Sequence, residues 1–415
     1  MSDSSTPRLG LPYLAASQAQ KQVTLNAAMA SLDGLVQTAV ESRTQTAPQS
    51  SPLDGQIWLV PSQPTDTDWN ALVGQLVRYE GGSWSSLPLV EGMLVYVKDE
   101  KVLALLGAGG WIELFPEKSP GLRNRLINGG FDIWQRGASI ACAADQTTFS
   151  ADRWQVWSAG APSTASLQPS GLPGGPRSAL SLAAGGGVTS AAVSQTLEQA
   201  MIADLAGERV TLSGWVKASR SLTLGVNLYA YGTPDQASSR ANVGWFSLGI
   251  VGPAWSFVQQ SFVLPAGFAA GGQVEFSLGS LAAGDTVGLA GLQLEAGGMA
   301  TAREVRLPGA ELWMCQRYYQ LTPALYGLVG TWTSPTTAVM SVALQPAMRA
   351  TPVCQPVPPG PVSVDCADVG TSSTTSFAVF ASPANLVMHA SSLAPARTAG
   401  GGAGCNTQIA CNAEI

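Results

Sequence analysis

The middle of the chain shows apolar and polar residues alternating with a period of two. In VTLSGWVKAS, one set of alternate positions holds Val210, Leu212, Gly214, Val216 and Ala218, and the other includes Trp215 and Lys217. In SLTLGVNLYAY, one set holds Leu222, Leu224, Val226, Leu228 and Ala230, and the other includes Asn227, Tyr229 and Tyr231. Successive side chains of a strand point to opposite faces. Both segments are therefore predicted to be strands with one apolar face.

Further strands are predicted over 255–264, 272–279 and 285–297, and glycine-rich turns separate them. A spacing of about ten residues between strands, with tight turns, is typical of two-sheet sandwiches. We therefore predict a jelly-roll β-sandwich over residues 119–308.

Residues 17–42 carry a helical pattern instead. Leu25, Met29, Leu32, Val36 and Ala39 are spaced by 4, 3, 4 and 3 residues. This heptad seam covers about two heptads, which is short for a coiled coil. Two alternatives stay open: the helix packs on its own domain, or it assembles with copies of itself.

Short predicted strands follow the Pro/Ser linker QTAPQSSP, and a short helix, GAELWMCQRYYQ, precedes strand-like sequence near the C-terminus. The expected fold is mainly β, with an N-terminal helix, a small β domain, the sandwich and a smaller C-terminal β domain. The predicted domains are an N-terminal helical anchor or oligomerisation segment at 1–45 and a small β domain at 46–118. The sandwich follows at 119–308, and a C-terminal β domain at 309–415.

Charge and hydropathy exclude two classes of partner. Only 12% of the residues are charged, the net charge is −6, and there is no basic stripe for nucleic acid. A secretory leader is not visible, and no apolar run approaches the roughly 18–20 residues that span a bilayer. We expect synthesis in a bacterial cytoplasm and no membrane insertion.

The six cysteines leave alternatives open. Cys142, Cys315, Cys354, Cys366, Cys405 and Cys411 fit free buried thiols, given cytoplasmic synthesis. Disulfides formed after release from the cell are a second reading. Zinc is disfavoured, because the chain has no CxxC motif and one histidine, His389, which we interpret as structural.

Catalytic signatures are missing from the sequence. It contains no GxSxG elbow, P-loop, GxGxxG fingerprint or HExxH motif. Sugar hydrolysis would need two carboxylates about 5–10 Å apart, and the sequence alone places no two acids together. We therefore expect a protein that is not an enzyme.

Saccharide binding fits the residues better. Flat aromatic side chains pack on sugar rings, and amides and charged groups bind the hydroxyls. The candidate residues are Trp157, Trp215, Asn227, Tyr229, Tyr231 and Trp245. The alternative is that these aromatic residues face the second sheet or a neighbouring subunit.

Ordered phrases of the sequence resemble phage proteins. Residues 9–114, with LGLPYLAASQAQKQVTLNAAMASLDGLVQ, DGQIWLV, GSWSSLPLVEGMLVYVKDE and GGWIEL, resemble the phage-associated domain DUF2793. Downstream, NRLINGGFDIWQRG, SADRW and LAGLQLEAGGMATAREVRLPGAELWMCQRYYQ resemble the receptor-binding region of phage tail fibres. The terminal QPAMRATPV and NTQIACNAEI fit the short β domain that often follows. One phrase departs from that pattern, because ATAREVR stands where ATPFE is expected.

The resemblance implies a fibre or head spike on the virion surface of a phage or gene transfer agent, in an alphaproteobacterial setting. Its implied partners are host capsular or lipopolysaccharide sugars and other virion proteins, at the tail or at a capsid vertex. It also implies a homo-oligomer, with a trimer favoured. The alternatives are a polysaccharide depolymerase and a purely structural virion adaptor.

Sugar-binding sandwiches of the kind the sequence resembles often hold a structural Ca²⁺ between their first and last strands. Asp132, in NGGFDIWQRG, and Glu295 are the candidate ligands. The alternative is that Asp132 caps a turn and Glu295 is solvated. In the same stretch, Asn128 to Gly130 are predicted to turn. Phe131, Ile133 and Trp134 are predicted to pack in the core or at an interface, and Arg136 is predicted to pair locally with an acid.

Overall fold

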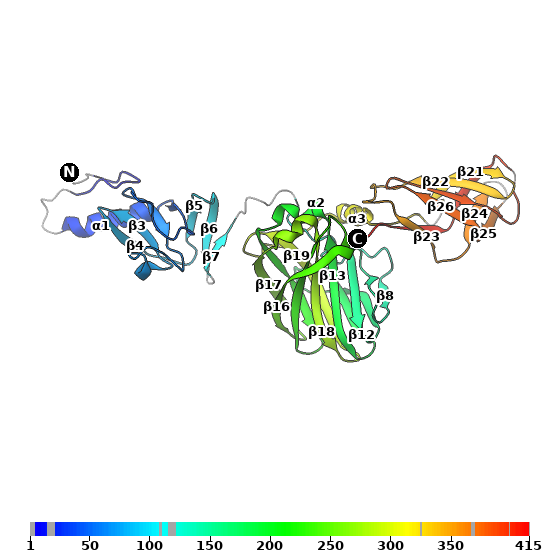
Figure 1. Ribbon diagram of the computed structural model, residues 1–415, viewed down its shortest axis with the longest axis horizontal. Helices are drawn as coiled ribbons and strands as arrows, with labels where there is room; N and C mark the ends of the chain where they lie inside the picture. The colour runs from blue at the N-terminus through cyan, green and yellow to red at the C-terminus, as the bar shows by residue number, and fades with distance from the viewer. Residues whose placement is uncertain are drawn as a thin grey trace. The chain divides into compact units, whose positions relative to one another are not determined.

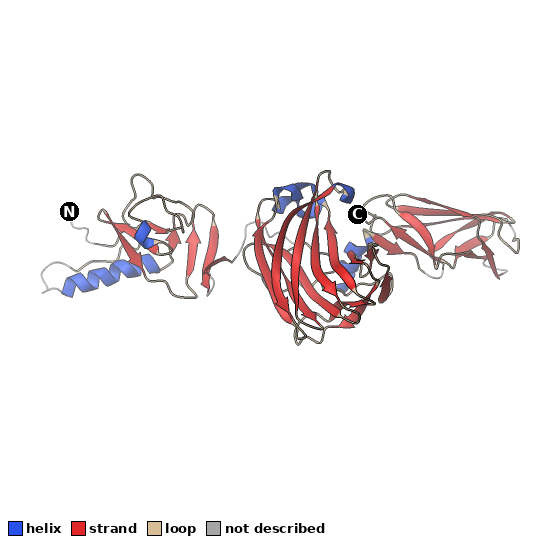
Figure 2. Ribbon diagram, turned by 60° about the horizontal axis from the view of Figure 1, so that its bottom comes forward, coloured by secondary structure: helices blue, strands red, loops and turns tan. Residues whose placement is uncertain are grey.

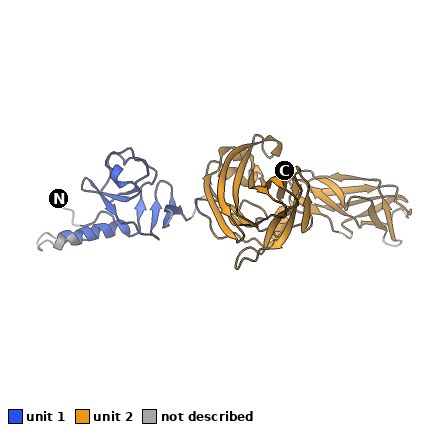
Figure 3. Cartoon of the chain, turned by 90° about the horizontal axis from the view of Figure 1, so that it is seen from below, with its two compact units in different colours: residues 1–119, 297–299 blue, residues 120–296, 300–415 orange. Residues whose placement is uncertain are grey.

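A computed structural model describes residues 5–14, 21–107, 110–114, 122–323, 326–366, 370–397 and 399–414. The chain forms two compact units, residues 1–119 with 297–299 and residues 120–296 with 300–415 (Figure 3). Strands are the main secondary structure of both units (Figure 2), so the predicted mainly β fold is confirmed. Within the described residues, no helix has the length and apolar character needed to cross a membrane.

The first unit contains one long helix and two small sheets. The helix is α1 (Lys21–Leu35), and the sheets have the strand orders β1-β5-β6-β7 and β2-β3-β4. Their elements are β1 (Ala39–Val40), β2 (Ile57–Leu59), η1 (Asn70–Leu72), β3 (Leu76–Glu80), β4 (Ser83–Leu87), β5 (Leu94–Val97), β6 (Val102–Gly107) and β7 (Gly110–Glu113).

The buried Asp33 fixes α1 to the segment before it. Its carboxylate accepts hydrogen bonds from the Thr6 hydroxyl at 2.8 Å and from two backbone amides, those of Arg8 and Leu9. The Arg8 guanidinium donates to the backbone carbonyls of Asp33 and Gly34. These carbonyls belong to the last turn of the helix, where no following helical amide can donate a hydrogen bond to them. Gly34 is required there, because an added Cβ would lie 2.7 Å from Leu87 Cδ1.

The helix is shorter than its predicted range of 17–42. Residues 15–20 lie outside the described part, and Val36 and Ala39 follow the last helical residue. Leu25 and Leu32 are 40% and 47% exposed. These two seam positions are therefore partly open to solvent, and self-assembly through them stays a prediction.

The second unit begins with a sandwich of two six-stranded antiparallel sheets. Sheet I has the order β16-β15-β18-β13-β10-β9, and sheet II has the order β17-β14-β19-β12-β11-β8 (Figure 1). The strands of sheet I are β9 (Thr148–Phe149), β10 (Trp154–Ala159), β13 (Val188–Leu197), β15 (Leu222–Tyr231), β16 (Arg240–Val251) and β18 (Gly272–Leu281). Those of sheet II are β8 (Ser139–Cys142), β11 (Ser163–Pro169), β12 (Ser178–Ala184), β14 (Arg209–Ala218), β17 (Ser256–Val263) and β19 (Thr286–Ala296). Short helices connect strands: α2 (Gln199–Ile202), η2 (Ala203–Leu205), η3 (Ala237–Ser239) and η4 (Ala266–Ala270).

The sandwich core forms from the inward faces of the two sheets. The apolar sets predicted on β14 and β15 are buried in one core cluster, except the side-chain-less Gly214. Phe131, Trp154 and Phe276 also join this cluster, with ring centroids 5.0 and 6.3 Å from Trp154. The period-two pattern therefore predicted the buried faces of these strands.

Residues 128–137 form the first turn of the sandwich. Asn128 has a φ of 55° and is 1% exposed, and its side-chain amide donates to the Ile133 and Asp152 carbonyls. Phe131 is buried in the core and Trp134 packs against it. Gly129 is required because an added Cβ would lie 2.1 Å from the Leu292 carbonyl oxygen. These contacts fix the turn that opens the sandwich.

The rest of the second unit is α3 (Pro308–Gln316) and two further sheets, with the orders β20-β29-β23 and β25-β24-β28-β21-β22-β27-β26. Their strands are β20 (Tyr319–Leu321), β21 (Leu328–Ser334), β22 (Thr337–Ala343), β23 (Val353–Val357), β24 (Val362–Cys366), β25 (Gly370–Thr374), β26 (Phe377–Ala381), β27 (Asn385–Ala390), β28 (Gly402–Cys405) and β29 (Gln408–Asn412). This part has its own core around Trp332, Met340 and Met388.

A buried ion cluster holds the C-terminal end of the chain against the sandwich. Glu414 pairs with Arg153 and, at 3.3 Å, with Arg136. Arg153 also donates to the Thr196 carbonyl and stacks on the Tyr318 ring at 3.5 Å. The Arg153 and Glu414 side chains are only 1% and 3% exposed. The prediction that Arg136 pairs with a local acid needs correction, because its partners are Asp152, at 3.7 Å, and Glu414, which is far away in the sequence.

All six cysteines are free thiols in the structure. Cys354 and Cys411 are direct partners across β23 and β29, and their sulfur atoms are 3.2 Å apart. We expect oxidised glutathione to convert these two thiols into a disulfide bond. The two thiols lose one hydrogen atom each, and one molecule of oxidised glutathione is reduced to two molecules of glutathione. Intact-mass spectrometry would then show a loss of two hydrogen atoms that Cys411→Ser abolishes, whereas a mixed glutathione adduct that persists would contradict this pairing.

Candidate functional site

The outer face of sheet I gathers polar and aromatic side chains in three cross-strand rows. Residues directly opposite each other in neighbouring strands point to the same face. The first row is Gln155, Ser194, Glu275, Asn227 and Trp245, the second is Trp157, Ala192, Ser277, Gly225 and Ser247, and the third is Thr196, Gln273, Tyr229 and Asn242. We call this face the sheet I platform.

Glu275 is the polar centre of the platform. One of its carboxylate oxygens accepts hydrogen bonds from the Asn227 amide at 3.0 Å and from the Tyr229 hydroxyl at 3.3 Å. Asn242 donates to the Asn227 carbonyl oxygen at 3.4 Å. Burial, and next the Glu275 carboxylate, raise the pKa of Tyr229, so its phenol stays protonated and donates. The second carboxylate oxygen of Glu275 has no hydrogen bond to a described residue, which leaves it open to a ligand hydroxyl.

A second polar group borders this centre. Gln273 accepts a hydrogen bond from Arg240 at 2.5 Å and donates to the Ser194 hydroxyl at 2.7 Å. The Arg240 guanidinium lies 5.1 Å from the Tyr229 ring centroid. These contacts hold the side chains in place without a ligand, so that a ligand would not have to order them.

Trp245 supplies a flat apolar surface beside the polar centre. Its side chain is 60% exposed, although large aromatic residues are usually well covered. Its indole lies over Gly225, where an added Cβ would come within 2.7 Å of Nε1. The small residues Ala192, Ser277 and Gly225 separate Trp157 from Ser247 and Trp245 along the neighbouring strands. The part of the platform between Trp157 and Trp245 therefore carries only small side chains.

The structure brings together four of the six predicted saccharide-binding residues, Trp157, Asn227, Tyr229 and Trp245. Two corrections are needed. Trp215 lies on β14 of sheet II, so it does not share a face with Tyr229. Tyr231 is 3% exposed, and burial raises the pKa of its phenol to about 12, so it offers no open surface.

Sequence reasoning missed Glu275, Gln273 and Arg240. GQVEFSLG was predicted as a strand, and its alternation puts Gln273 and Glu275 on one face with polar character. The missing information was the strand order, because β18 pairs with β15 although β16 and β17 lie between them in sequence.

The two predicted calcium ligands have different surroundings. Glu295 is fully buried, and it accepts hydrogen bonds from Gln293 and from the amide and hydroxyl of Thr301. Asp132 is exposed. The part of the chain that the structure describes contains no group of three or more His, Cys, Asp or Glu residues placed to hold a metal ion. The predicted solvation of Glu295 is wrong, and a Ca²⁺ role for the pair stays a prediction.

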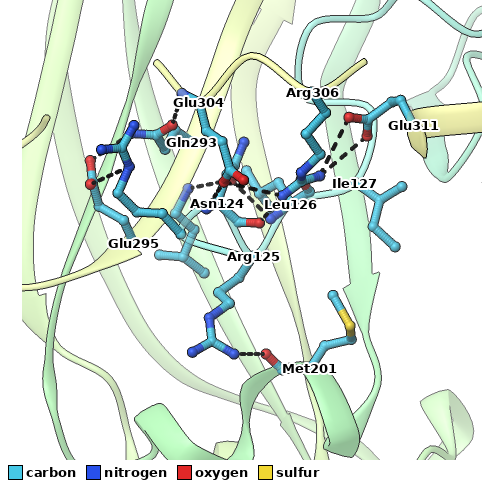
Figure 4. A network of polar contacts seen from close by, with 12 residues as sticks. Asn124, Arg125, Leu126, Ile127, Met201, Gln293, Glu295, Glu304, Arg306 and Glu311 are labelled. Carbon is cyan, nitrogen blue, oxygen red and sulfur yellow. Dashed lines mark hydrogen bonds and ion pairs between the residues drawn. The ribbon is translucent and has the colours of Figure 1, made fainter. Parts of the chain in front are cut away.

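Glu295 belongs to a network that joins the segment before the first strand of the sandwich to the last strand, β19, and to the residues that follow it (Figure 4). Arg123 lies 3.7 Å from the Glu295 carboxylate, Glu304 accepts from the Asn124 amide at 2.5 Å, and Arg306 donates to the Leu126 carbonyl. Arg306 also pairs with Glu311 at 3.3 Å. Gln293, Thr301 and Arg123 thus supply the buried Glu295 carboxylate with partners from the chain itself.

The site makes a direct prediction for Gly225→Ala. The added methyl group would displace the Trp245 indole, and we expect saccharide affinity to fall by roughly tenfold. Titration calorimetry would measure the affinity, and the intrinsic fluorescence would report the moved indole. Gly187→Ala is the matched control, because its Cβ would meet nothing within 4 Å. Unchanged affinity in Gly225→Ala would show that the indole position does not matter for binding.

Comparison with solved structures finds sugar-binding and phage proteins that resemble part of the chain. TmCBM61 in complex with β-1,4-galactotriose shares 15% identity, with a TM-score of 0.26, over 42% of this chain and 99% of that chain. A protein from Bacteroides thetaiotaomicron described as a putative sugar binding protein shares 11%, with a TM-score of 0.29, over 42% and 100%. The enzymatically active domain of tailspike protein 4 from bacteriophage CBA120 shares 14%, with a TM-score of 0.26, over 42% and 21%. At such identities and TM-scores these similarities decide nothing about a ligand.

Comparisons of the sequence itself give one match. No curated protein matches the chain. The family model described as protein of unknown function (DUF2793) matches residues 25–112, which lie within the first unit. The chain therefore carries a DUF2793 domain in its first unit.

Proposed function

We propose that the chain binds polysaccharide through the sheet I platform. The observation that carries this proposal is the position of Trp245, which lies open to solvent over Gly225 and next to the Asn227–Glu275 pair. A sugar ring has an apolar face that packs on a flat indole, and hydroxyl groups at its edge that need polar partners. Asn227, Glu275 and Asn242 supply amide and carboxylate groups within reach of such hydroxyls.

The platform favours binding without cleavage. Glycoside hydrolysis uses two carboxyl groups about 5–10 Å apart. Among the paired positions in the three rows, all of which the structure describes, Glu275 is the only carboxylate. One of its oxygens accepts hydrogen bonds from Asn227 and Tyr229, and the other remains for a ligand hydroxyl. We therefore infer an attachment protein rather than a depolymerase.

The biological setting is part of the same proposal. We infer that the chain is a fibre or head spike on the surface of a phage or gene transfer agent particle, and that it attaches the particle to host surface polysaccharide. The resemblance of residues 122–320 to phage receptor-binding regions and the DUF2793 domain support this inference. The exposed Leu25 and Leu32 of α1 suit a homo-oligomer held through the first unit.

Affinity chromatography tests the proposal. The purified full chain is immobilised and exposed to capsular polysaccharides and lipopolysaccharides from encapsulated alphaproteobacteria. We expect retention of at least one polysaccharide, eluted at its original chain length. Retention of none would refute polysaccharide binding and favour the structural adaptor, and shortened chains in the eluate would favour the depolymerase.

A further inference from the structure

A second cleft lies on the outer side of the sandwich at sheet II. Two adjoining cavities of about 370 and 490 Å³ share Gly175, Arg303 and Val305 in their walls. The smaller one runs from the loop at 173–176 over Trp215 and Phe257. The larger one continues past Asp132 and Arg177. Because sheet II and sheet I are opposite layers of the sandwich, this cleft is separate from the sheet I platform.

The floor of the smaller cavity is aromatic. Trp215 and Phe257 are direct partners across β14 and β17, and their ring centroids are 5.3 Å apart at an interplanar angle of 62°. Phe257 is 48% exposed, so the edge of this pair is open. A pair of rings of this kind provides an apolar surface that matches one face of a sugar ring.

Arg303 is the only charged residue in the wall of this smaller cavity. Its aliphatic part lies beside Gly291, and its Nη1 atom lies 3.3 Å from the position that a Cβ of Gly130 would take. The Asp132 Oδ2 atom lies 2.8 Å from the same position, on the side of the larger cavity. Among the described residues its guanidinium has no hydrogen bond or ion pair, in contrast to Arg306, which binds two carbonyls and Glu311. An unpaired guanidinium in a cleft is a site for a carboxylate, which it can bind through two parallel hydrogen bonds.

Ser213 provides a polar group in the wall of the same cavity. Its side chain is on the outer face of β14, and no hydrogen bond joins its hydroxyl to a described residue. The hydroxyl is therefore available to a ligand that enters the cavity.

We propose that this cleft binds a carboxylate-bearing sugar residue. The sugar ring stacks on Trp215 and Phe257, its carboxylate binds Arg303, and one of its hydroxyl groups hydrogen-bonds to Ser213. The adjoining cavity carries both signs of charge, with Arg177 and Arg306 as well as Asp132, Glu304 and Glu311 in its walls, so the preference for a carboxylate rests on Arg303. The proposal rests on the proposed function only in taking a saccharide as the ligand, because the residues of the two sites do not overlap.

Titration calorimetry with three small ligands tests the cleft in the full chain. The ligands are trigalacturonate, neutral galactotriose and acetate. We expect trigalacturonate to bind Trp245→Ala, which lacks the platform indole, and we expect Arg303→Gln to lower its affinity by roughly tenfold or more. Acetate should bind far more weakly because it has no ring. Equal binding of trigalacturonate by Arg303→Gln and the wild type would overturn the proposal, as would loss of this binding in Trp245→Ala.

Two additional variants separate binding from folding. Arg303→Lys keeps the charge without the two-pronged geometry and should recover part of the affinity, and Ser213→Ala removes only the hydroxyl group and should weaken binding with an unchanged unfolding temperature. Wild-type protein that binds trigalacturonate but retains no polysaccharide would refute the proposed function alone. Wild-type protein that retains a neutral polysaccharide but does not bind trigalacturonate would refute the cleft alone.

Discussion

Replacing Glu414 by Gln is expected to destabilise the second unit by about 3 kcal/mol, because it leaves the buried Arg153 guanidinium without its counter-charge. Removal of one partner of a buried ion pair costs more than the pair itself contributes, since the remaining charge cannot regain water. Glu414 also pairs with Arg136, which stacks on the Tyr319 ring at 3.7 Å. The loss therefore extends to both arginines that join the C-terminal segment to the sandwich.

Differential scanning calorimetry would measure this effect as a decrease of roughly 5–10 °C in the unfolding temperature. Asp204→Asn is the matched control, because Asp204 also pairs with an arginine, Arg125 at 2.6 Å, but its side chain is 46% exposed. Its cost should stay below about 1 kcal/mol. Equal losses in the two variants would mean that burial of the Glu414 cluster contributes nothing special.

Replacing Trp245 by Ala is expected to weaken polysaccharide binding by about 2 kcal/mol, or roughly thirtyfold in Kd. The indole is the largest exposed apolar surface that borders the Glu275 centre, and alanine provides no surface for a sugar ring. Stability should change little, because the side chain is mostly in solvent and lies on the edge strand β16.

Trp313→Ala controls for the loss of an exposed tryptophan as such. Trp313 is 59% exposed, almost the same fraction as Trp245, but it lies on α3, outside the platform. Surface plasmon resonance on an immobilised polysaccharide would compare the three proteins. Equal weakening in both variants would point to non-specific adhesion of aromatic residues and not to a platform.

The alternation of residues predicted which side chains of β14 and β15 face outward, but not which strands lie together. Trp215 and Tyr229 both face solvent, yet they belong to opposite sheets of the sandwich. A period of two records burial on one side of a strand, and it contains no information about the partner strand. The platform depends on that partner, because Asn227 meets Glu275 only through the pairing of β15 with β18.

The partners in long-range ion pairs could not be predicted from the local sequence either. Arg136 was predicted to pair with a local acid, but it pairs with Asp152 and Glu414, which only the folding of the chain brings to it. The burial of Glu295 could not be predicted from the sequence for the same reason. Its donors come from Thr301 and from Arg123, which begins the sandwich. The apolar pattern of a strand can be read from its own sequence, whereas the partners of its polar side chains depend on which segments become neighbours in the fold.

Fluorine NMR of the full chain labelled with 5-fluorotryptophan tests the central claim most directly. The resonance of Trp245 is assigned from a Trp245→Phe variant and followed during titration with a polysaccharide that the protein retains. The account predicts that the Trp245 resonance shifts and saturates with the affinity measured by calorimetry, while the resonance of Trp313 does not move. A polysaccharide that binds with this affinity and leaves Trp245 unshifted would contradict the sheet I platform as the binding site.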